Sequence, residues 1–378
     1  MTGRDEPTSD QNQQQLVDVL RLSLVPGVGP RTRKALLERF GTPAEVLRAA
    51  PCELREVHGV GPKLLRKIVA AGEEIHAEDE IELCREHGIR ILTDADPRYP
   101  ELLRQIPDPP GVLFLRGELK PQDGLAIAIV GTRHPTQYGL RQAGRLAASL
   151  ARAGLTIISG LARGIDGAAH RGALEAGGRT LAVLASGVLN IYPPEHEKLA
   201  AEVAAQGALV SEAPPRGEPL AGAFPQRNRL ISGMALGAII VEAADRSGAL
   251  ITARHAMEQG REVFAVPGRI EDRTSRGCHR LIRDGAKLIE SPDDVLEELG
   301  PLFKATPRED GQVIHHPAEL LLNEVEQQVL SAIGSDTTSI DEVVARTGLP
   351  VPQVLSTISV LEVRHVIRRL SGTMVARV

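Results

Sequence analysis

The chain has 378 residues, and its 44 Lys and Arg residues against 49 Asp and Glu residues leave a formal net charge of −5. A chain of this length is expected to form two or three domains, one of which can bury a sizeable core. Because no overall positive charge exists, any nucleic-acid binding has to come from local basic patches. Phe and Tyr are scarce and Trp is absent, which argues against a surface tiled with stacking rings.

The cysteines and the apolar runs predict that the protein is cytoplasmic. Cys52, Cys84 and Cys278 are far apart and include no C-x-x-C pair, which predicts a reducing environment, no disulfide framework and no zinc site. The first 15 residues are polar, and the longest apolar runs, such as 125–130, are too short to cross a bilayer. We expect a cytoplasmic protein with no membrane partner, no metal and no cofactor.

A repeat follows a polar tail (1–12) that we expect to be disordered. The pattern L-x-x-V-x-G-V-G-P occurs at 22–30 and again at 54–62, and basic residues follow each copy. A capping box lies between the two copies at 42–45. We predict a small all-α domain over 13–88 with two helix–hairpin–helix-like repeats. Their turn amides suit phosphates, but acidic residues outnumber basic ones in 1–88, so a protein–protein module is the alternative.

From residue 89 onward, short apolar runs rich in Val and Ile alternate with helical stretches. This alternation predicts βαβ units, and we expect an α/β core over 89–302, an extended Rossmann-like, doubly wound and mostly parallel sheet. Buried strands are predicted at 126–130, 156–158, 180–184, 208–210, 238–241 and 263–266, and two further short strands at 89–92 and 112–115.

The remainder of the chain predicts a third domain. Residues 303–317 are polar, with Pro, Gly and two His, and are typical of a linker. Residues 318–378 predict three helices and a two-stranded wing with a turn at Ser371-Gly372. We therefore predict a C-terminal winged-helix domain. Its acidic residues outnumber its basic ones, which favours interaction or autoregulation over reading of the major groove.

The first predicted core strand leads into Gly131-Thr132-Arg133. The glycine lets the backbone approach a ligand, and the amides of the next helix N-terminus favour an anion. The dinucleotide fingerprint G-x-G-x-x-G is absent, and no acidic residue after the second strand could hold a ribose diol. The sequence therefore gives little support to NAD binding.

A glycine-rich loop from Ser159 to Gly164 follows the second predicted strand and leads into Asp166 and His170. The loop predicts a tight turn whose amides either hold a phosphate or serve only the fold. We favour structural roles for the two residues that follow: Asp166 caps the helix, and His170 is a helix residue whose ring is satisfied by a neighbour.

The run F-P-Q-R-N-R at 224–229 follows the strand predicted at 208–210. In the usual doubly wound order, 3-2-1-4-5-6, the loops after strands one and four meet at the topological switch point. Arg133, Arg227 and Arg229 would then converge on one crevice, where their repulsion calls for a polyanion or carboxylates. Gly248 would open a helix beside the same crevice.

No catalytic constellation stands out in the sequence. Glu242 and Asp245 could serve acid–base chemistry, but nothing near them resembles a nucleophile. We predict a protein that is not an enzyme. The rival interpretation is a nucleotide-processing hydrolase of the phosphoribohydrolase-like class, whose P-G-G-x-G-T-x-x-E loop this sequence lacks.

Taken together, the motifs resemble those of the DNA-processing protein A family (DprA, also called Smf). The runs are G-T-R-H-P-T-Q-Y-G at 131–139, S-G-L-A-R-G-I-D-G-A-A-H at 159–170, Y-P-P-E-H at 192–196, F-P-Q-R-N-R at 224–229, S-G-A-L-I-T-A at 247–253 and A-V-P-G at 265–268. The resemblance covers roughly 90–300. It implies a Rossmann core that binds and protects single-stranded DNA, a homodimer, and loading of RecA in natural transformation and homologous recombination.

The resemblance also implies roles for individual residues. The single-stranded-DNA contacts that it implies are Gly131, Thr132, Arg133, Ser159, Gly160, Ala162, Arg163, Gly164, Phe224, Gln226, Arg227, Asn228, Arg229 and Gly248. The dimer or RecA contacts that it implies lie in 278–289, at Leu281, Ile282, Leu288 and Ile289. Gln226 stands where many members carry a basic residue, so affinity should depend more on Arg227. A pure adaptor that contacts RecA without contacting DNA is a third interpretation.

Overall fold

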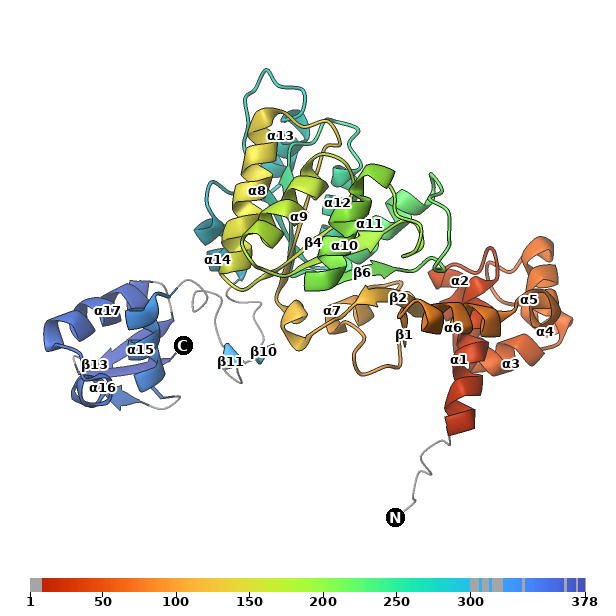
Figure 1. Cartoon of the computed structure of the whole chain (residues 1–378), viewed down its shortest axis with the longest axis horizontal. Helices are drawn as coiled ribbons and strands as arrows, with labels where there is room; N and C mark the ends of the chain where they lie inside the picture. Colours follow the sequence, from red (N-terminus) through yellow and green to blue (C-terminus); the bar gives the residue numbers. More distant parts are fainter. Residues whose placement is uncertain are drawn as a thin grey trace, which may run out of the picture.

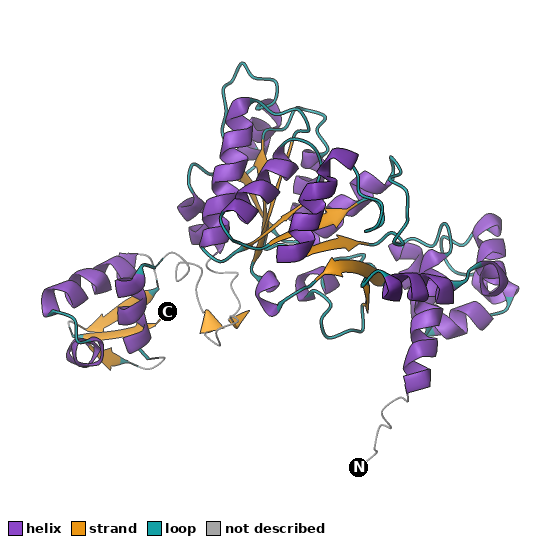
Figure 2. Ribbon diagram, viewed as in Figure 1, coloured by secondary structure: helices purple, strands orange, loops and turns teal. Residues whose placement is uncertain are grey.

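The computed structural model describes residues 9–299, 306–307, 313–314, 322–334, 337–363, 366–371 and 373–377. Figures 1 and 2 show a helical N-terminal unit, a central unit in which helices cover a sheet, and a small C-terminal unit. Within the described residues, no helix is both long and apolar enough to cross a membrane.

The N-terminal unit is built from helices, as its repeats and capping box predict. The helices are α1 (Ser9–Leu24), α2 (Pro30–Phe40), α3 (Pro43–Arg48), α4 (Pro51–Arg55), α5 (Pro62–Glu74) and α6 (Ala77–Glu86). The predicted capping box is confirmed, because Thr42 Oγ1 accepts from the Glu45 amide and the Glu45 carboxylate accepts from the Thr42 amide. α1 includes residues 9–12, so the prediction of a disordered tail is wrong for those four residues, and 1–8 lie outside the described part.

The two repeats pack against each other in a twofold-like manner. A Cβ atom added at Gly27 would lie 3.4 Å from Leu64, and one added at Gly59 would lie 3.5 Å from Thr32. Gly27 and Gly59 are equivalent positions of the repeat, as are Thr32 and Leu64, so each glycine turn faces the helix that follows the other turn.

The central unit contains a nine-stranded sheet with the order β1-β2-β6-β5-β4-β3-β7-β8-β9. The strands are β1 (Arg90–Thr93), β2 (Val112–Gly117), β3 (Ala126–Gly131), β4 (Thr156–Ser159), β5 (Thr180–Leu184), β6 (Ala208–Ser211), β7 (Gly237–Val241), β8 (Glu262–Ala265) and β9 (Lys287–Leu288). Strands β3 to β9 pair in parallel, and β1 and β2 extend the sheet in antiparallel fashion. The mostly parallel, Rossmann-like sheet is confirmed.

The strand order differs from the predicted one. β6 lies beyond β5, and β7 instead pairs with the free edge of β3. The position beyond β5 lets β6 pair on both edges, in parallel with β5 and antiparallel with β2, which explains why all four of its residues are buried. The topological switch point therefore lies between β3 and β7.

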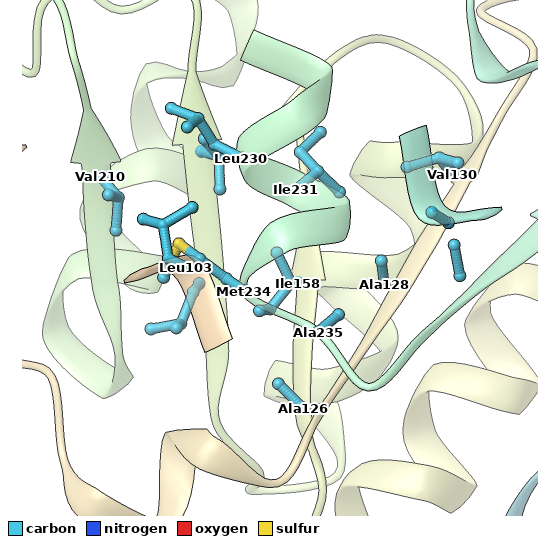
Figure 3. Close-up of a cluster of buried hydrophobic side chains, with 14 of the residues drawn as sticks. Leu103, Ala126, Ala128, Val130, Ile158, Val210, Leu230, Ile231, Met234 and Ala235 are labelled. Carbon is cyan, nitrogen blue, oxygen red and sulfur yellow. The ribbon is translucent and has the colours of Figure 1, made fainter. Parts of the chain in front are cut away.

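Helices cover both faces of this sheet. They are α7 (Glu101–Arg104), α8 (Gln137–Arg152), α9 (Ile165–Glu175), α10 (Glu197–Gln206), α11 (Ala223–Gly233), α12 (Ala249–Glu258), α13 (Arg276–Arg283) and α14 (Pro292–Leu299), with 3₁₀ turns η1 (Pro121–Gly124) and η2 (Pro194–His196). Alternate residues of β3 face opposite layers: Ile127 packs with α8, α9 and α14, whereas Ala128 packs with α11 and α12. Figure 3 shows Leu230 and Ile231 of α11 in one buried cluster with Ala126 and Ala128 of β3.

The N-terminal unit packs directly on the central unit. Val17 and Leu20 of α1 and Cys84 of α6 share one buried cluster with Phe114 of β2. A buried guanidinium also bridges the two units, because Arg33 Nη1 lies 2.9 Å from Asp94 Oδ2.

The C-terminal unit is a winged helix with a buried cluster of its own. Its helices are α15 (Glu324–Ala332), α16 (Ile340–Thr347) and α17 (Val351–Val363), and its sheet has the order β12-β14-β13, with β12 (Thr338–Ser339), β13 (Ile367–Ser371) and β14 (Met374–Arg377). The segment predicted as a linker contains one antiparallel pair, β10 (Thr306–Pro307) with β11 (Val313–Ile314), and otherwise lies outside the described residues.

Candidate nucleic-acid interface

A crevice of about 600 Å³ opens at the carboxyl ends of β3 and β7, beside the switch point. Eight of the residues that the resemblance implies line it: Gly131, Thr132, Arg133, Ala162, Phe224, Arg227, Asn228 and Gly248. A smaller adjoining recess is lined by Gly160 and Arg163, together with Tyr192. The structure thus brings the loops after β3 and β4 together with the start of α11 and the segment after β7.

Arg133 and Arg246 are both exposed cations that line this crevice, and Arg133 also contacts an aromatic ring. The side chain of Arg133 makes no ion pair within the described part of the chain, and its guanidinium carbon lies 5.0 Å from the centroid of the Phe224 ring. Stacking on a ring leaves the edge of a guanidinium free to donate to an anion. Arg133 is therefore placed to bind a phosphate while Phe224 orients it.

Arg227 forms part of the floor of the crevice instead of its surface. The residue is only 6% exposed, and its Nη1 donates to Gly160 O at 2.6 Å and to Val183 O. Burial lowers the pKa of Arg227 to about 10, an effect that Asp166 opposes. The guanidinium stays charged at neutral pH, so it adds positive potential beneath the crevice while its Nη1 remains bound to protein.

Asp166 holds the glycine-rich loop in shape. It is the second residue of α9, whose N-cap is Gly164, so the predicted capping role is wrong. The carboxylate instead accepts from the amides of Gly160 (3.1 Å) and Ala162 (3.4 Å). Burial raises the pKa of Asp166, and the nearby Arg227 opposes that rise. Because two of its amides already bind Asp166, the loop has fewer donors for a phosphate than its sequence suggests.

Arg229 does not join the other arginines. Its side chain is buried, with Nη2 lying 2.5 Å from Glu212 and Nη1 donating to Asp108 O at 2.8 Å. The segment at 224–229 is not a loop but the start of α11. Side chains two positions apart on a helix are rotated by about 200° around its axis, so they point to nearly opposite sides. The prediction that three guanidiniums converge is therefore wrong for Arg229.

Three other implied residues have structural or peripheral positions. Ser159 is fully buried and donates to Ile129 O at 2.6 Å, so it faces the sheet. Gln226 is exposed and lies outside the lining of the crevice. Gly164 does not line the crevice but allows the loop after β4 to approach Thr132.

A second aromatic ring lies beside Phe224. Tyr192 lies edge-on to it, with 5.8 Å between the ring centroids, and Arg163 lies near the Tyr192 ring while pairing with Glu195. Residue-level reasoning from the sequence missed Tyr192 as a site residue, although the Y-P-P-E-H run at 192–196 was the signal that could have found it.

Glu242, the candidate acid–base residue, is already engaged. It is buried, its backbone has φ +59°, and its carboxylate accepts from the amide (2.9 Å) and the hydroxyl of Thr136 at the start of α8. Among the described residues, no group of His, Cys, Asp and Glu is arranged to hold a metal ion. The carboxylate therefore joins β7 to α8.

The four residues implied in self-association or RecA contact separate into two pairs. Leu281 and Ile289 are buried in the core, so they cannot form a surface. Ile282 is half-buried, and Leu288 is 41% exposed on β9, which ends the sheet.

Residues 90–300 match the family described as DNA recombination-mediator protein A. The chain belongs to this family. The helix and wing arrangement at the C-terminus matches the DprA winged helix domain over 315–373, and the N-terminal repeats match a SAM-like helix-hairpin-helix tandem over 19–72. The predicted family and the predicted kinds of domain are confirmed.

Individual DprA relatives cover most of the chain. A protein named Smf from Synechocystis is 33% identical over 93% of this chain and 96% of its own length. The DNA processing protein DprA of Bacillus subtilis is 47% identical over 57% of this chain and 73% of its own length.

Two solved DprA structures share the fold. That of Streptococcus pneumoniae has a TM-score of 0.65 and 34% identity, and covers 75% of this chain and 97% of its own. That of Helicobacter pylori, described as giving insight into a single-stranded-DNA binding mode, has a TM-score of 0.51 and 31% identity, and covers 56% of this chain and 95% of its own.

Proposed function

We propose that this protein binds and protects single-stranded DNA in the crevice between β3 and β7 and helps to load RecA onto it, in natural transformation and homologous recombination. The observation that carries the proposal is the exposed Arg133, free of ion pairs in the described structure and stacked on Phe224 at the mouth of the crevice. Family membership and the single-stranded-DNA binding of the Helicobacter pylori relative support it.

The crevice suits a strand whose bases are accessible. Arg133, with Arg227 beneath it, attracts phosphates, and the neighbouring rings of Phe224 and Tyr192 offer apolar contact to a base. Bases in a duplex are stacked and paired, so they cannot reach such rings without unstacking. We therefore expect a preference for single strands over duplex and a steep loss of affinity with salt.

The deciding experiment titrates labelled oligo-dT and a duplex of equal length with the full chain and with Arg133→Ala. We expect the substitution to weaken single-strand binding by about tenfold or more at low salt, because one charge-assisted phosphate contact is lost. Arg152→Ala is the matched control, since Arg152 is exposed at the far end of α8. Equal affinity of Arg133→Ala and the unmodified protein would exclude the crevice as the binding site.

The absence of catalysis is part of the proposal. A phosphoribohydrolase-like enzyme would need a carboxylate free to act on a nucleotide, and both oxygens of Glu242 are bound to Thr136. Incubation with nucleoside monophosphates should release no base. Release of free base that disappears in Glu242→Gln would favour the hydrolase instead.

We also propose that the protein associates with itself through the end of the sheet that carries β9. Leu288 and Ile282 are large apolar side chains accessible there, and among the residues that the structure describes β9 pairs only with β8. An open strand edge with an apolar side chain favours pairing with a second copy.

The contact with RecA is tested by filament assembly on oligo-dT with and without this protein.

A further inference from the structure

The loop between β8 and α13, residues 266–275, stands beside the crevice. β8 is parallel to β3 and β7, so its carboxyl end lies at the same edge of the sheet. The amide of Gly277, just after the loop, donates to Ala243 O at 2.8 Å, and the adjacent Ala244 lines the crevice. Figure 1 shows α13 at the top of the view.

The start of the loop is anchored by two contacts. Tyr138 Oη donates to Pro267 O at 2.8 Å, and His279 Nε2 lies 3.0 Å from Gly268 O. A short turn closes the tip, where the amide of Asp272 donates to Arg269 O. The tip therefore projects from a fixed base.

The loop and α13 carry an unneutralised positive charge. Residues 269–283 contain five arginines, at 269, 273, 276, 280 and 283, against Glu271 and Asp272. All five arginines are exposed, and within the described part of the chain none makes an ion pair. Some exposed arginines elsewhere, such as Arg85, Arg98 and Arg163, do pair with a carboxylate. Guanidiniums left without a counter-charge at a crevice edge favour a polyanion.

An apolar residue stands at the tip among these charges. Ile270 is 78% exposed, the highest value among the large apolar side chains that the structure describes. Its neighbours along the chain are charged, so the tip combines a phosphate-binding group with an apolar contact. Proteins that bind nucleic acids place apolar side chains against unstacked bases next to basic residues in this way.

We propose that the 266–275 loop is a second contact site for the same single strand, which leaves the crevice past Ala244 and continues over the loop. Arg269 and Arg273 bind phosphates of the flanking nucleotides, and Ile270 packs against one unstacked base. The inference rests on the proposed function of the crevice and extends it, since it makes affinity depend on strand length.

The first experiment compares a short oligo-dT of about five nucleotides, enough for the crevice, with one of about twenty. The double variant Arg269→Gln, Arg273→Gln should bind the short strand within about twofold of the unmodified protein. It should bind the long strand about five- to tenfold more weakly, with a salt slope reduced by about 1.4, because two phosphate contacts are lost. Arg152→Gln is the matched control.

The second experiment places a reporter at the tip. The chain contains no Trp and three Tyr, so Ile270→Trp provides a single Trp whose emission can be excited selectively at wavelengths that Tyr does not absorb. Its fluorescence should be quenched on saturation with the long strand and not with the short one. Equal quenching by both strands, or none by either, would overturn the assignment.

The outcomes separate this inference from the function of the crevice. Both the crevice function and the loop site are supported if Arg133→Ala weakens binding of both strand lengths and the double variant weakens binding of the long strand alone. Undiminished long-strand binding by the double variant overturns the loop site alone, whereas absence of binding by the unmodified protein overturns the proposed function. A double variant that changes the oligomeric state and not DNA affinity would assign the loop to a protein contact.

Discussion

Arg227 and Arg229 show how strongly the role of an arginine depends on the direction in which its helix turns it. Arg227 donates to backbone carbonyls beneath the crevice, whereas Arg229 pairs with Glu212 on the other side of α11. Both are buried, so each needs nearby partners to remain charged inside the protein. Only the first adds its charge to the crevice.

Arg229→Met should therefore destabilise the fold without changing the site. We expect a loss of about 2–3 kcal/mol in the free energy of unfolding, less than for a fully buried pair because Glu212 remains partly exposed. Urea unfolding measures this loss, and oligo-dT affinity of the folded variant should be unchanged. An affinity loss equal to that of Arg133→Ala would mean that Arg229 contacts DNA after all.

His170 gives the protein an acid-sensitive core. It is fully buried in α9, with Nδ1 lying 2.7 Å from Thr180 Oγ1, and burial lowers its pKa to about 3. The unfolded chain takes up this proton near the ordinary pKa of about 6.5. Between those values the unfolded state holds more protons, so stability falls as the pH falls below about 6.5 and levels off above it.

The His170→Leu variant tests this coupling. Its free energy of unfolding between pH 6.5 and pH 5 should fall less steeply than that of the unmodified protein, by about 1 kcal/mol per pH unit. Unfolding in urea at several pH values measures both slopes, with His87→Leu on the exposed end of α6 as control. Identical slopes for His170→Leu and the unmodified protein would contradict the prediction.

At the scale of elements, the site depends on three loops that meet where the parallel strands β3, β4 and β7 end. Gly164 has φ +77° and ψ −122°, and a Cβ atom added there would lie 2.4 Å from Thr132 O. The amide of Thr132 is itself bound to Glu242 O at 2.8 Å, so the loops after β3, β4 and β7 hold one another. The crevice is thus a product of backbone packing as much as of arginines.

Gly164→Ala should accordingly damage both stability and binding. We expect a loss of about 2 kcal/mol or more in the free energy of unfolding, from backbone strain and the close contact, and about a tenfold loss of oligo-dT affinity. Gly177→Ala is the control, because Gly177 also has positive φ but no atom lies within 4 Å of an added Cβ. If Gly164→Ala binds DNA as tightly as the control, the loop contact does not shape the crevice.

At the scale of the whole molecule, the central unit offers a crevice at one edge of the sheet and an open strand at one end of it. The N-terminal unit is joined to it through the cluster that includes Val17 and Phe114 and through the ion pair of Arg33 with Asp94. The winged helix has a separate core. Self-association through β9 would therefore leave the crevice of each copy accessible.

Leu288→Arg tests this assembly. A charge at an apolar contact should raise the dissociation constant of the self-associated form by about tenfold or more, as measured by sedimentation at several concentrations. Val69→Arg, which alters a similarly exposed apolar residue on α5, should leave it unchanged. A Leu288→Arg protein that associates like the unmodified one would exclude β9 as the contact.

The sequence by itself determined the family, the three kinds of domain and eight of the residues that line the crevice, because these depend on local patterns: glycine turns, capping residues, and strand-to-helix alternation. Thr42 with Glu45 is such a case, since its hydrogen bonds span only three residues. Only the tertiary structure decided the position of β6, the burial of Arg229 and Ser159, and the place of Tyr192 beside Phe224. These depend on which strands pair and which way a helix faces, and such choices are made by contacts between residues far apart in the chain.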